Sequence, residues 1–138
     1  MPIDYAVDGD RDLMICIASG AVTNQSVVSW MRRLIEDPAY RTGMNAVVDA
    51  RPIEDLVVNA DAIDDIVDLA TKMEHRFAGS RWAVIADRDG LFGLSRMYEL
   101  RREAQTYDVR AFREAAEAYA WLGLPEDYDP PTVQELES

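Results

Sequence analysis

The sequence predicts a single α/β domain built on a mostly parallel central sheet. Short apolar runs alternate along the chain with segments whose apolar residues recur at helical spacing. The chain opens with two apolar runs separated by an Asp-Gly step, which indicates an antiparallel hairpin. The 138 residues, 49% of them hydrophobic, suffice for one core. We expect a domain at residues 1–124, with about five strands and about four helices, and an acidic, Pro-rich tail at 125–138.

The predicted hairpin joins strands at Ile3–Val7 and Leu13–Ala18 through the turn Asp8–Asp12. Its Asp-Gly step suits a turn that needs positive φ. Cys16 lies within the second apolar run and is the only cysteine, so the domain has no internal disulfide. We therefore interpret Cys16 as a small core residue and not as a reactive thiol.

A first helix is predicted after Thr23 or Asn24, either of which can cap its start, and it ends before Pro38. The short apolar run Asn45–Ala50 then predicts a strand buried on both faces of the sheet. The segment 53–58 is either a connector or a further short strand.

A second helix is predicted from apolar residues that recur at helical spacing from Ile63 to Phe77, with Gly79 at its end. Its opposite side carries an acidic stripe: Asp61, Asp64, Asp65 and Asp68. We interpret this stripe as a solvated face, or as a surface for a basic partner, because cation sites usually take their oxygen ligands from a turned loop.

Trp82–Ala86 predicts another inner strand, followed by a third helix that starts near Asp89 or Gly90. The expected packing residues of this helix are Leu91, Leu94 and Met97. The alternation in Tyr107–Phe112 is typical of an edge strand, and Gly123 is placed to end a last helix. The apolar stripe of that helix comprises Phe112, Ala115, Ala116, Tyr119 and Leu122.

Charge and hydropathy exclude several classes of function. The formal net charge of −12 and the lack of a basic stripe disfavour nucleic acid as a partner, because phosphate contacts need Lys and Arg. No stretch approaches the ~18 apolar residues of a membrane span, and no basic segment followed by an apolar run opens the chain. We expect a soluble, cytoplasmic protein.

The sequence offers no catalytic set and no metal or cofactor site. His75 is the only histidine, and it lies among charged residues at a helix end, so no nucleophile and base can be paired. The sequence Asp87–Gly90 resembles the start of a calcium-binding loop but lacks the later Glu that such a loop requires. We interpret it as a strand-to-helix turn in which Asp89 caps the helix and Gly90 or Gly93 relieves crowding.

Three stretches carry a resemblance to a known family: Val47–Arg51, Phe92–Glu99 and Phe112–Gly123. In their order and spacing the chain resembles the SpoIIAA-like branch of the STAS superfamily, often grouped with SEC14-like domains. The resemblance implies a small sheet with helices on one side, in a family whose many bacterial members have no established activity. Regulatory members bind partner proteins and carry a phosphorylatable Ser or Thr at the start of a helix. The matching stretch here, Val58–Ala62, has no hydroxyl group, although Asp61 places a fixed negative charge there.

The leading hypothesis is a non-enzymatic, STAS-like interaction domain that forms a homodimer or binds another protein. Its expected surface lies at the carboxyl ends of the inner strands, where Arg51, Arg88 and Arg96 border a crevice for an anionic ligand or partner. The candidate residues are Asp49, Arg51, Asp61, Asp87, Arg88 and Arg96. The alternative is a binder of a lipid or other small apolar ligand, held between the third helix and the sheet, as the SEC14 resemblance implies. An enzyme of unknown type is the third hypothesis.

Overall fold

The computed structural model describes residues 2–72, 74–101 and 107–130, which form seven strands and five helices. In chain order these are β1 (Ile3–Asp8), β2 (Leu13–Ala18), β3 (Gly20–Thr23), α1 (Asn24–Glu36), β4 (Asn45–Asp49), β5 (Ile53–Val57), α2 (Ala60–Lys72), α3 (Glu74–Phe77), β6 (Arg81–Ile85), α4 (Asp89–Arg101), β7 (Asp108–Phe112) and α5 (Ala115–Trp121). Within that part of the chain, no helix is both long enough and apolar enough to cross a membrane.

The central sheet has five strands in the order β1-β2-β4-β6-β7. β1 and β2 form the antiparallel hairpin, and the remaining neighbours are parallel. The predicted mostly parallel sheet with an N-terminal hairpin is therefore confirmed. The positive φ in the hairpin turn falls on Asp12 and not on Gly9, so the Asp-Gly step predicted the turn but not its conformation.

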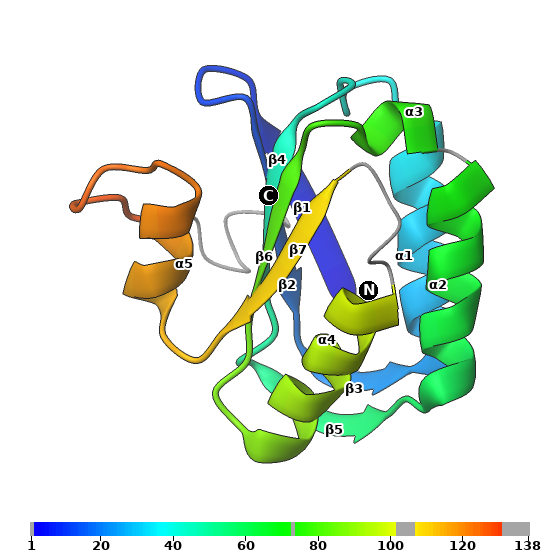
Figure 1. The fold of residues 1–138 in the computed structure, drawn as a ribbon. Helices are drawn as coiled ribbons and strands as arrows, with labels where there is room; N and C mark the ends of the chain where they lie inside the picture. The colour runs from blue at the N-terminus through cyan, green and yellow to red at the C-terminus, as the bar shows by residue number, and fades with distance from the viewer. Residues whose placement is uncertain (1, 73, 102–106, 131–138) are drawn as a thin grey trace.

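Helices cover both faces of this sheet. α1, α2, α3 and α4 lie on one face, and α5 lies alone on the other (Figure 1). Side chains of the inner strands alternate between the two layers, so that Trp82 belongs to the first core and Ala83 to the second. On the second face, Ala118 and Leu122 of the α5 segment pack against the sheet, including Ile85. The expected arrangement, with helices on one side only, is thus incomplete, because a short C-terminal helix crosses to the opposite face.

The larger core is rich in aromatic side chains. Phe77 lies against Trp82, Tyr40 and Tyr107, with ring centroids 5.4–5.7 Å apart. Trp30 meets Trp82 from the α1 side. Burying each of these large side chains contributes roughly 1.5–3 kcal/mol, which makes this cluster the main anchor of the helical layer on the sheet.

The start of α1 follows the capping signal in the sequence. Thr23 is the N-cap residue, and its hydroxyl accepts a hydrogen bond from the Ser26 backbone N–H at 3.2 Å. The Ser26 hydroxyl in turn accepts one from the Thr23 backbone N–H, which completes a capping box. The helix ends at Glu36, and its C-cap residue Asp37 stands directly before Pro38, as predicted.

A second, two-stranded parallel sheet joins β3 to β5 and lies beside the lower ends of α2 and α4 in Figure 1. The sequence allowed either a connector or a short strand at residues 53–58, and the structure has the strand β5 there. β3 was not predicted, because it has only four residues and only Val22 among them is buried. This small sheet closes one end of the layer between the helices and the central sheet.

The remaining differences concern the later elements. The predicted helix from Ile63 to Phe77 divides into α2 and α3. In α4, Leu91 is buried, but Met97 is 36% exposed and so contributes less to packing than expected. In α5, Ala118 occupies the core and Ala116 is exposed. Gly123 ends that helix with φ 77°, as predicted.

The predicted tail at 125–138 begins within the described residues. The Tyr128 ring packs edge-on against Tyr119, with 5.1 Å between ring centroids, and the Tyr128 backbone N–H donates to the Pro125 carbonyl. Residues 131–138 lie outside the described part of the chain.

Candidate functional site

An apolar cavity of about 140 Å³ lies between the helical layer and the central sheet. Its walls come from α1, α2 and α4, from strands of the central sheet, and from the small sheet. Trp30 and Trp82 form part of the wall, and Ile63 and Ile66 face it from α2. Ser95 is the single polar residue among the described lining residues, and its hydroxyl already donates to the Leu91 carbonyl at 3.0 Å.

The cavity lies between α2 and the central sheet. α2 packs on α1 and α4, and its Ile63 and Ile66 line one wall. The opposite wall combines small and larger side chains of the sheet: Ile3, Ala18, Val48, Trp82, Val84 and Val109, with Ala50 directly after β4. Val22 and Ile53 of the small sheet line the end of the cavity.

The lining has no charge and almost no free hydrogen-bonding capacity. The Trp82 indole N–H donates to the Ser80 hydroxyl at 3.1 Å, which in turn donates to the Phe77 carbonyl at 2.6 Å. The Trp30 indole N–H is buried and has no acceptor among the described residues. An apolar space of this kind favours apolar molecules, because a polar ligand would lose its hydration and gain at most this one donor as a partner.

Asp49 and Arg51 form a closed pair at the end of β4. The Arg51 guanidinium donates twice to the Asp49 carboxylate, with N–O distances of 2.9 and 2.8 Å. The Asp49 carboxylate raises the pKa of Arg51 by hydrogen bonding. Asp87, exposed after β6, adds a smaller contribution in the same direction. The structure thus brings Asp49, Arg51 and Asp87 together, and the positive charge of Arg51 is already paired with the Asp49 carboxylate.

The other three candidate residues lie elsewhere. The Arg88 guanidinium donates to the Ile53 carbonyl, which ties the turn before α4 to the small sheet. Arg96 is exposed on α4, and Asp61 is exposed in the first turn of α2. None of the six candidate residues lines the apolar cavity.

Sequence reasoning missed a pair of asparagines that joins the starts of two helices. The Asn24 side-chain N–H donates to the side-chain oxygen of Asn59 at 2.9 Å, and the Asn59 backbone N–H donates to the side-chain oxygen of Asn24 at 3.1 Å. The Asn59 oxygen also accepts from the Asp61 backbone N–H, which caps α2. Asn24 could be predicted as a cap of α1, but nothing in the spacing of the two residues indicates that they meet.

Titratable groups in the described part of the chain form no cluster of the kind that binds a metal ion. No three His, Cys, Asp or Glu side chains gather there as a metal site would need. His75 is exposed on α3, and Cys16 is fully buried in β2, where burial raises the pKa of its thiol to about 12. Cys16 is therefore the core residue that was predicted, protonated at neutral pH.

Comparison with known proteins supports the fold. No family model and no curated protein matches the sequence. Among solved structures, the chain is similar to an uncharacterized protein from the DUF3478 family, from Shewanella loihica PV-4, described as having a SpoIIAA-like fold. The two chains are 19% identical, with a TM-score of 0.57, and the match covers 87% of this chain and 93% of the other. This chain therefore has a SpoIIAA-like fold.

Proposed function

We propose that this chain is a non-catalytic binding domain whose cavity takes a compact apolar molecule. The observation that carries the proposal is the space of about 140 Å³ between α1, α2, α4 and the sheets, lined by apolar side chains and Ser95. An unfilled space in a core costs stability, because its lining atoms lose dispersion contacts. A ligand that filled it would recover those contacts.

The volume sets the size of the ligand. Apolar cavities of about 150 Å³ stay dry and accept benzene or xenon, whereas drug-sized ligands occupy about 300–1,000 Å³. A space of about 140 Å³ therefore suits a single aromatic ring or a short branched hydrocarbon group. A long acyl chain does not fit without movement of α2 or α4.

Leu56 and Val58 are two of the half-buried residues of the cavity wall. They lie at the end of β5, next to Val57, whose side chain is 61% exposed. Small displacements of this segment would open a route between the small sheet and α2. We therefore propose entry on this side.

The direct test is thermal denaturation of the full chain with benzene, toluene or decanoate. A ligand that binds only the folded state raises the unfolding temperature, and the increase grows with the logarithm of ligand concentration once this exceeds Kd. We expect benzene and toluene to raise the unfolding temperature and decanoate to leave it unchanged. Ala50→Leu, which puts three more carbon atoms into the cavity, should abolish the increase.

Ala116→Leu is the matched control, because Ala116 is exposed on α5 and the same substitution there leaves the cavity unchanged. It should bind like the unaltered chain. If no aromatic compound raises the unfolding temperature up to its solubility limit, or if Ala116→Leu blocks binding as well as Ala50→Leu does, the proposal fails.

A further inference from the structure

We infer that a row of arginines on the β7 side of the molecule binds a short acidic segment of another protein. The row, here called the arginine surface, comprises Arg81, Arg110, Arg113, Phe92, Phe112 and Trp121. It is independent of the apolar cavity, since none of these residues lines that cavity.

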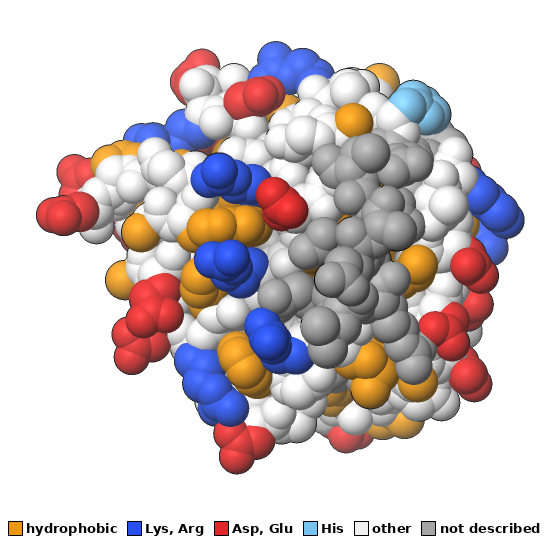
Figure 2. Space-filling view, viewed as in Figure 1, with side chains coloured by type: hydrophobic (Ala, Val, Ile, Leu, Met, Phe, Trp, Pro, Cys, Tyr) orange, Lys and Arg blue, Asp and Glu red, His pale blue; other side chains and the backbone are white. Residues whose placement is uncertain are grey.

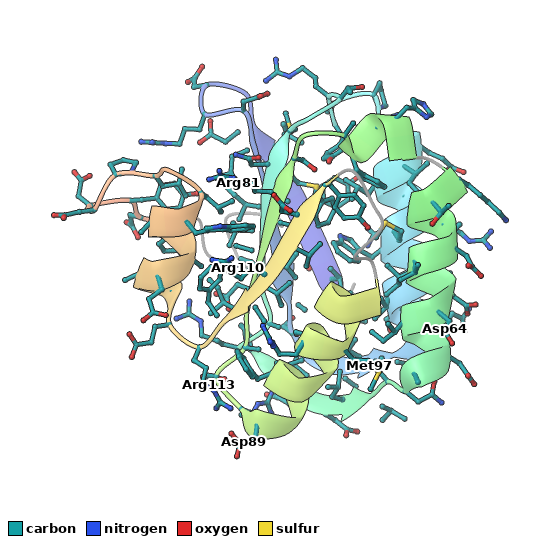
Figure 3. The ribbon with its side chains drawn as sticks, viewed as in Figure 1. Asp64, Arg81, Asp89, Met97, Arg110 and Arg113 are labelled. Atoms are coloured by element: carbon teal, nitrogen blue, oxygen red, sulfur yellow. The ribbon has the colours of Figure 1, made fainter. Side chains whose placement is uncertain are left out.

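Figures 2 and 3 show the arrangement. Arg81, Arg110 and Arg113, labelled in Figure 3, follow one another along β6, β7 and the turn after β7. In Figure 2, Lys and Arg side chains alternate with hydrophobic side chains along the same line. Such a row stands out in a chain with 26 acidic and 14 basic residues.

Each arginine is held over an aromatic ring. The guanidinium carbons of Arg81 and Arg110 lie 5.6 and 5.4 Å from the centre of the Trp121 ring. Arg81 also donates to the Trp121 carbonyl at 2.9 Å. Stacking fixes the plane of a guanidinium while leaving its edge free to donate, so less side-chain entropy is lost when a carboxylate binds.

Arg113 extends the row toward α4. Its guanidinium lies 4.5 Å from the centre of the Phe92 ring and forms an ion pair with Asp89 at 2.7 Å. The Asp89 side chain is 94% exposed, so this pair is weak and a partner carboxylate can replace it. Arg96, one helical turn beyond Phe92 on α4, lies on the same side of the helix.

The spacing indicates an extended partner. Ala83 is the partner of Arg110 in the parallel register, so Arg81 and Arg110 point to the same face and differ by two positions along neighbouring strands. Two residues of strand and one strand spacing place them roughly 8 Å apart. Alternate side chains of an extended peptide repeat at about 7 Å, so carboxylates two residues apart can each meet one arginine.

The acidic character of the whole chain limits the partner to a short segment. A net charge of −12 repels a long polyanion, so nucleic acid is disfavoured even though arginines stacked on aromatic rings can bind it. A few carboxylates on a flexible segment can engage the arginine surface without facing the acidic remainder.

The test is fluorescence anisotropy of a labelled peptide with four Ser-Glu repeats, titrated with the full chain. The same peptide with Gln in place of Glu and a labelled oligothymidylate serve as comparison probes. We expect binding of the Glu peptide alone, weakening as salt rises because exposed charges are screened. Arg110→Gln and Arg81→Gln should each weaken it about tenfold.

Arg32→Gln is the matched control, because Arg32 is exposed on α1, away from the row, and its loss should change affinity less than about twofold. Arg110→Lys keeps the charge but loses the bidentate fork, so it should fall between the unaltered chain and Arg110→Gln. Unfolding temperatures of all variants show whether each is folded. Equal effects of Arg32→Gln and Arg110→Gln, equal binding of the Gln peptide, absence of peptide binding, or preference for oligothymidylate would each overturn the proposal.

Discussion

The Trp30 and Trp82 rings meet edge to face, with 6.1 Å between centroids and 68° between ring planes, in the wall of the apolar cavity. Trp30 comes from α1 and Trp82 from β6, so this contact joins the helical layer to the sheet at the point where the cavity begins. Beside these two bulky indoles, the lining includes the small side chains of Ala18 and Ala50. The cavity is thus a local mismatch in the packing of this core.

This mismatch predicts that an Ala→Val substitution costs less stability beside the cavity than on the other face of the sheet. Ala50→Val adds two carbon atoms toward the cavity and should leave the free energy of unfolding within about 1 kcal/mol of the original, or raise it. Ala83→Val adds them to the packed core under α5, where Ala83 has no exposed surface, and should cost about 1–3 kcal/mol. Urea denaturation of both variants measures the difference. Equal losses would show that the space near Ala50 is already filled.

A second prediction concerns Arg76, which closes the carboxyl end of α1. Its guanidinium donates to the carbonyls of Ile35, Asp37 and Tyr40 and lies 5.6 Å from the centre of the Tyr40 ring. Lysine keeps the charge but cannot reach three carbonyls in one plane. Arg76→Lys should therefore lower the free energy of unfolding by about 1–3 kcal/mol.

Arg32→Lys provides the comparison, since Arg32 is exposed on α1, the helix whose carboxyl end Arg76 contacts. It should stay within about 0.5 kcal/mol of the unaltered chain in the same urea experiment. A similar loss in both variants would contradict the specific role of the three carbonyl contacts.

Much of this fold follows from short-range sequence signals. The hairpin, the Thr23 cap, the strand before Ala50 and the Gly123 terminator each depend on residues that lie close together in the chain. β3 does not, because its pairing with β5 unites four residues with a segment some thirty positions later, and only Val22 among them is buried. Local periodicity carries no information about such a pairing.

The site was less predictable than the fold. Strand-end position predicted a surface near the Asp49–Arg51 and Asp87–Arg96 junctions, but it did not indicate that the Asp49 carboxylate would pair with the Arg51 guanidinium. The arginine surface depends on the register between β6 and β7 and on the return of Trp121 from α5. These contacts join segments that are far apart in the chain, and local sequence patterns do not predict which such segments meet.

A third prediction separates two glycines by their backbone conformation. Gly93 lies in α4 with open space around it, so it relieves no crowding, contrary to the expectation from the sequence. Gly93→Ala should raise the free energy of unfolding by about 0.5–1 kcal/mol. Gly43 has φ 80°, and a Cβ there would lie 3.3 Å from the Ala78 carbonyl oxygen. Gly43→Ala should therefore lower stability by about 1–2 kcal/mol. Thermal denaturation should give a higher unfolding temperature for Gly93→Ala and a lower one for Gly43→Ala. A shift in the same direction for both variants would contradict the explanation by backbone conformation.

The last prediction is a pH dependence that originates in Tyr5. Its hydroxyl donates to the Asp37 carboxylate at 2.6 Å, and this bond lowers the pKa of Asp37. Burial, followed by the bond to Asp37, raises the pKa of Tyr5 to about 12. The folded chain therefore favours a charged Asp37 and a neutral Tyr5.

The pKa shifts of Asp37 and Tyr5 fix the sign of the pH dependence of stability. A carboxyl whose pKa falls on folding stabilises the chain above its unfolded pKa of about 3.9, and the contribution is lost as pH falls through the folded value. A tyrosine whose pKa rises on folding stabilises the chain below about pH 10, and the contribution is lost as pH rises toward 12. The stability difference between the unaltered chain and Tyr5→Phe should thus be largest from about pH 5 to 9 and should shrink on both sides.

Tyr128→Phe is the control for this experiment. The Tyr128 hydroxyl is buried and has no acceptor among the described residues, so its removal should be neutral or stabilising at neutral pH. Because no carboxylate depends on it in the way that Asp37 depends on Tyr5, the effect of Tyr128→Phe should not change between about pH 7 and pH 3. Urea denaturation across this range distinguishes the two variants. If the effect of Tyr5→Phe also stays constant as pH falls, the hydrogen bond to Asp37 contributes nothing to the acid stability of the fold.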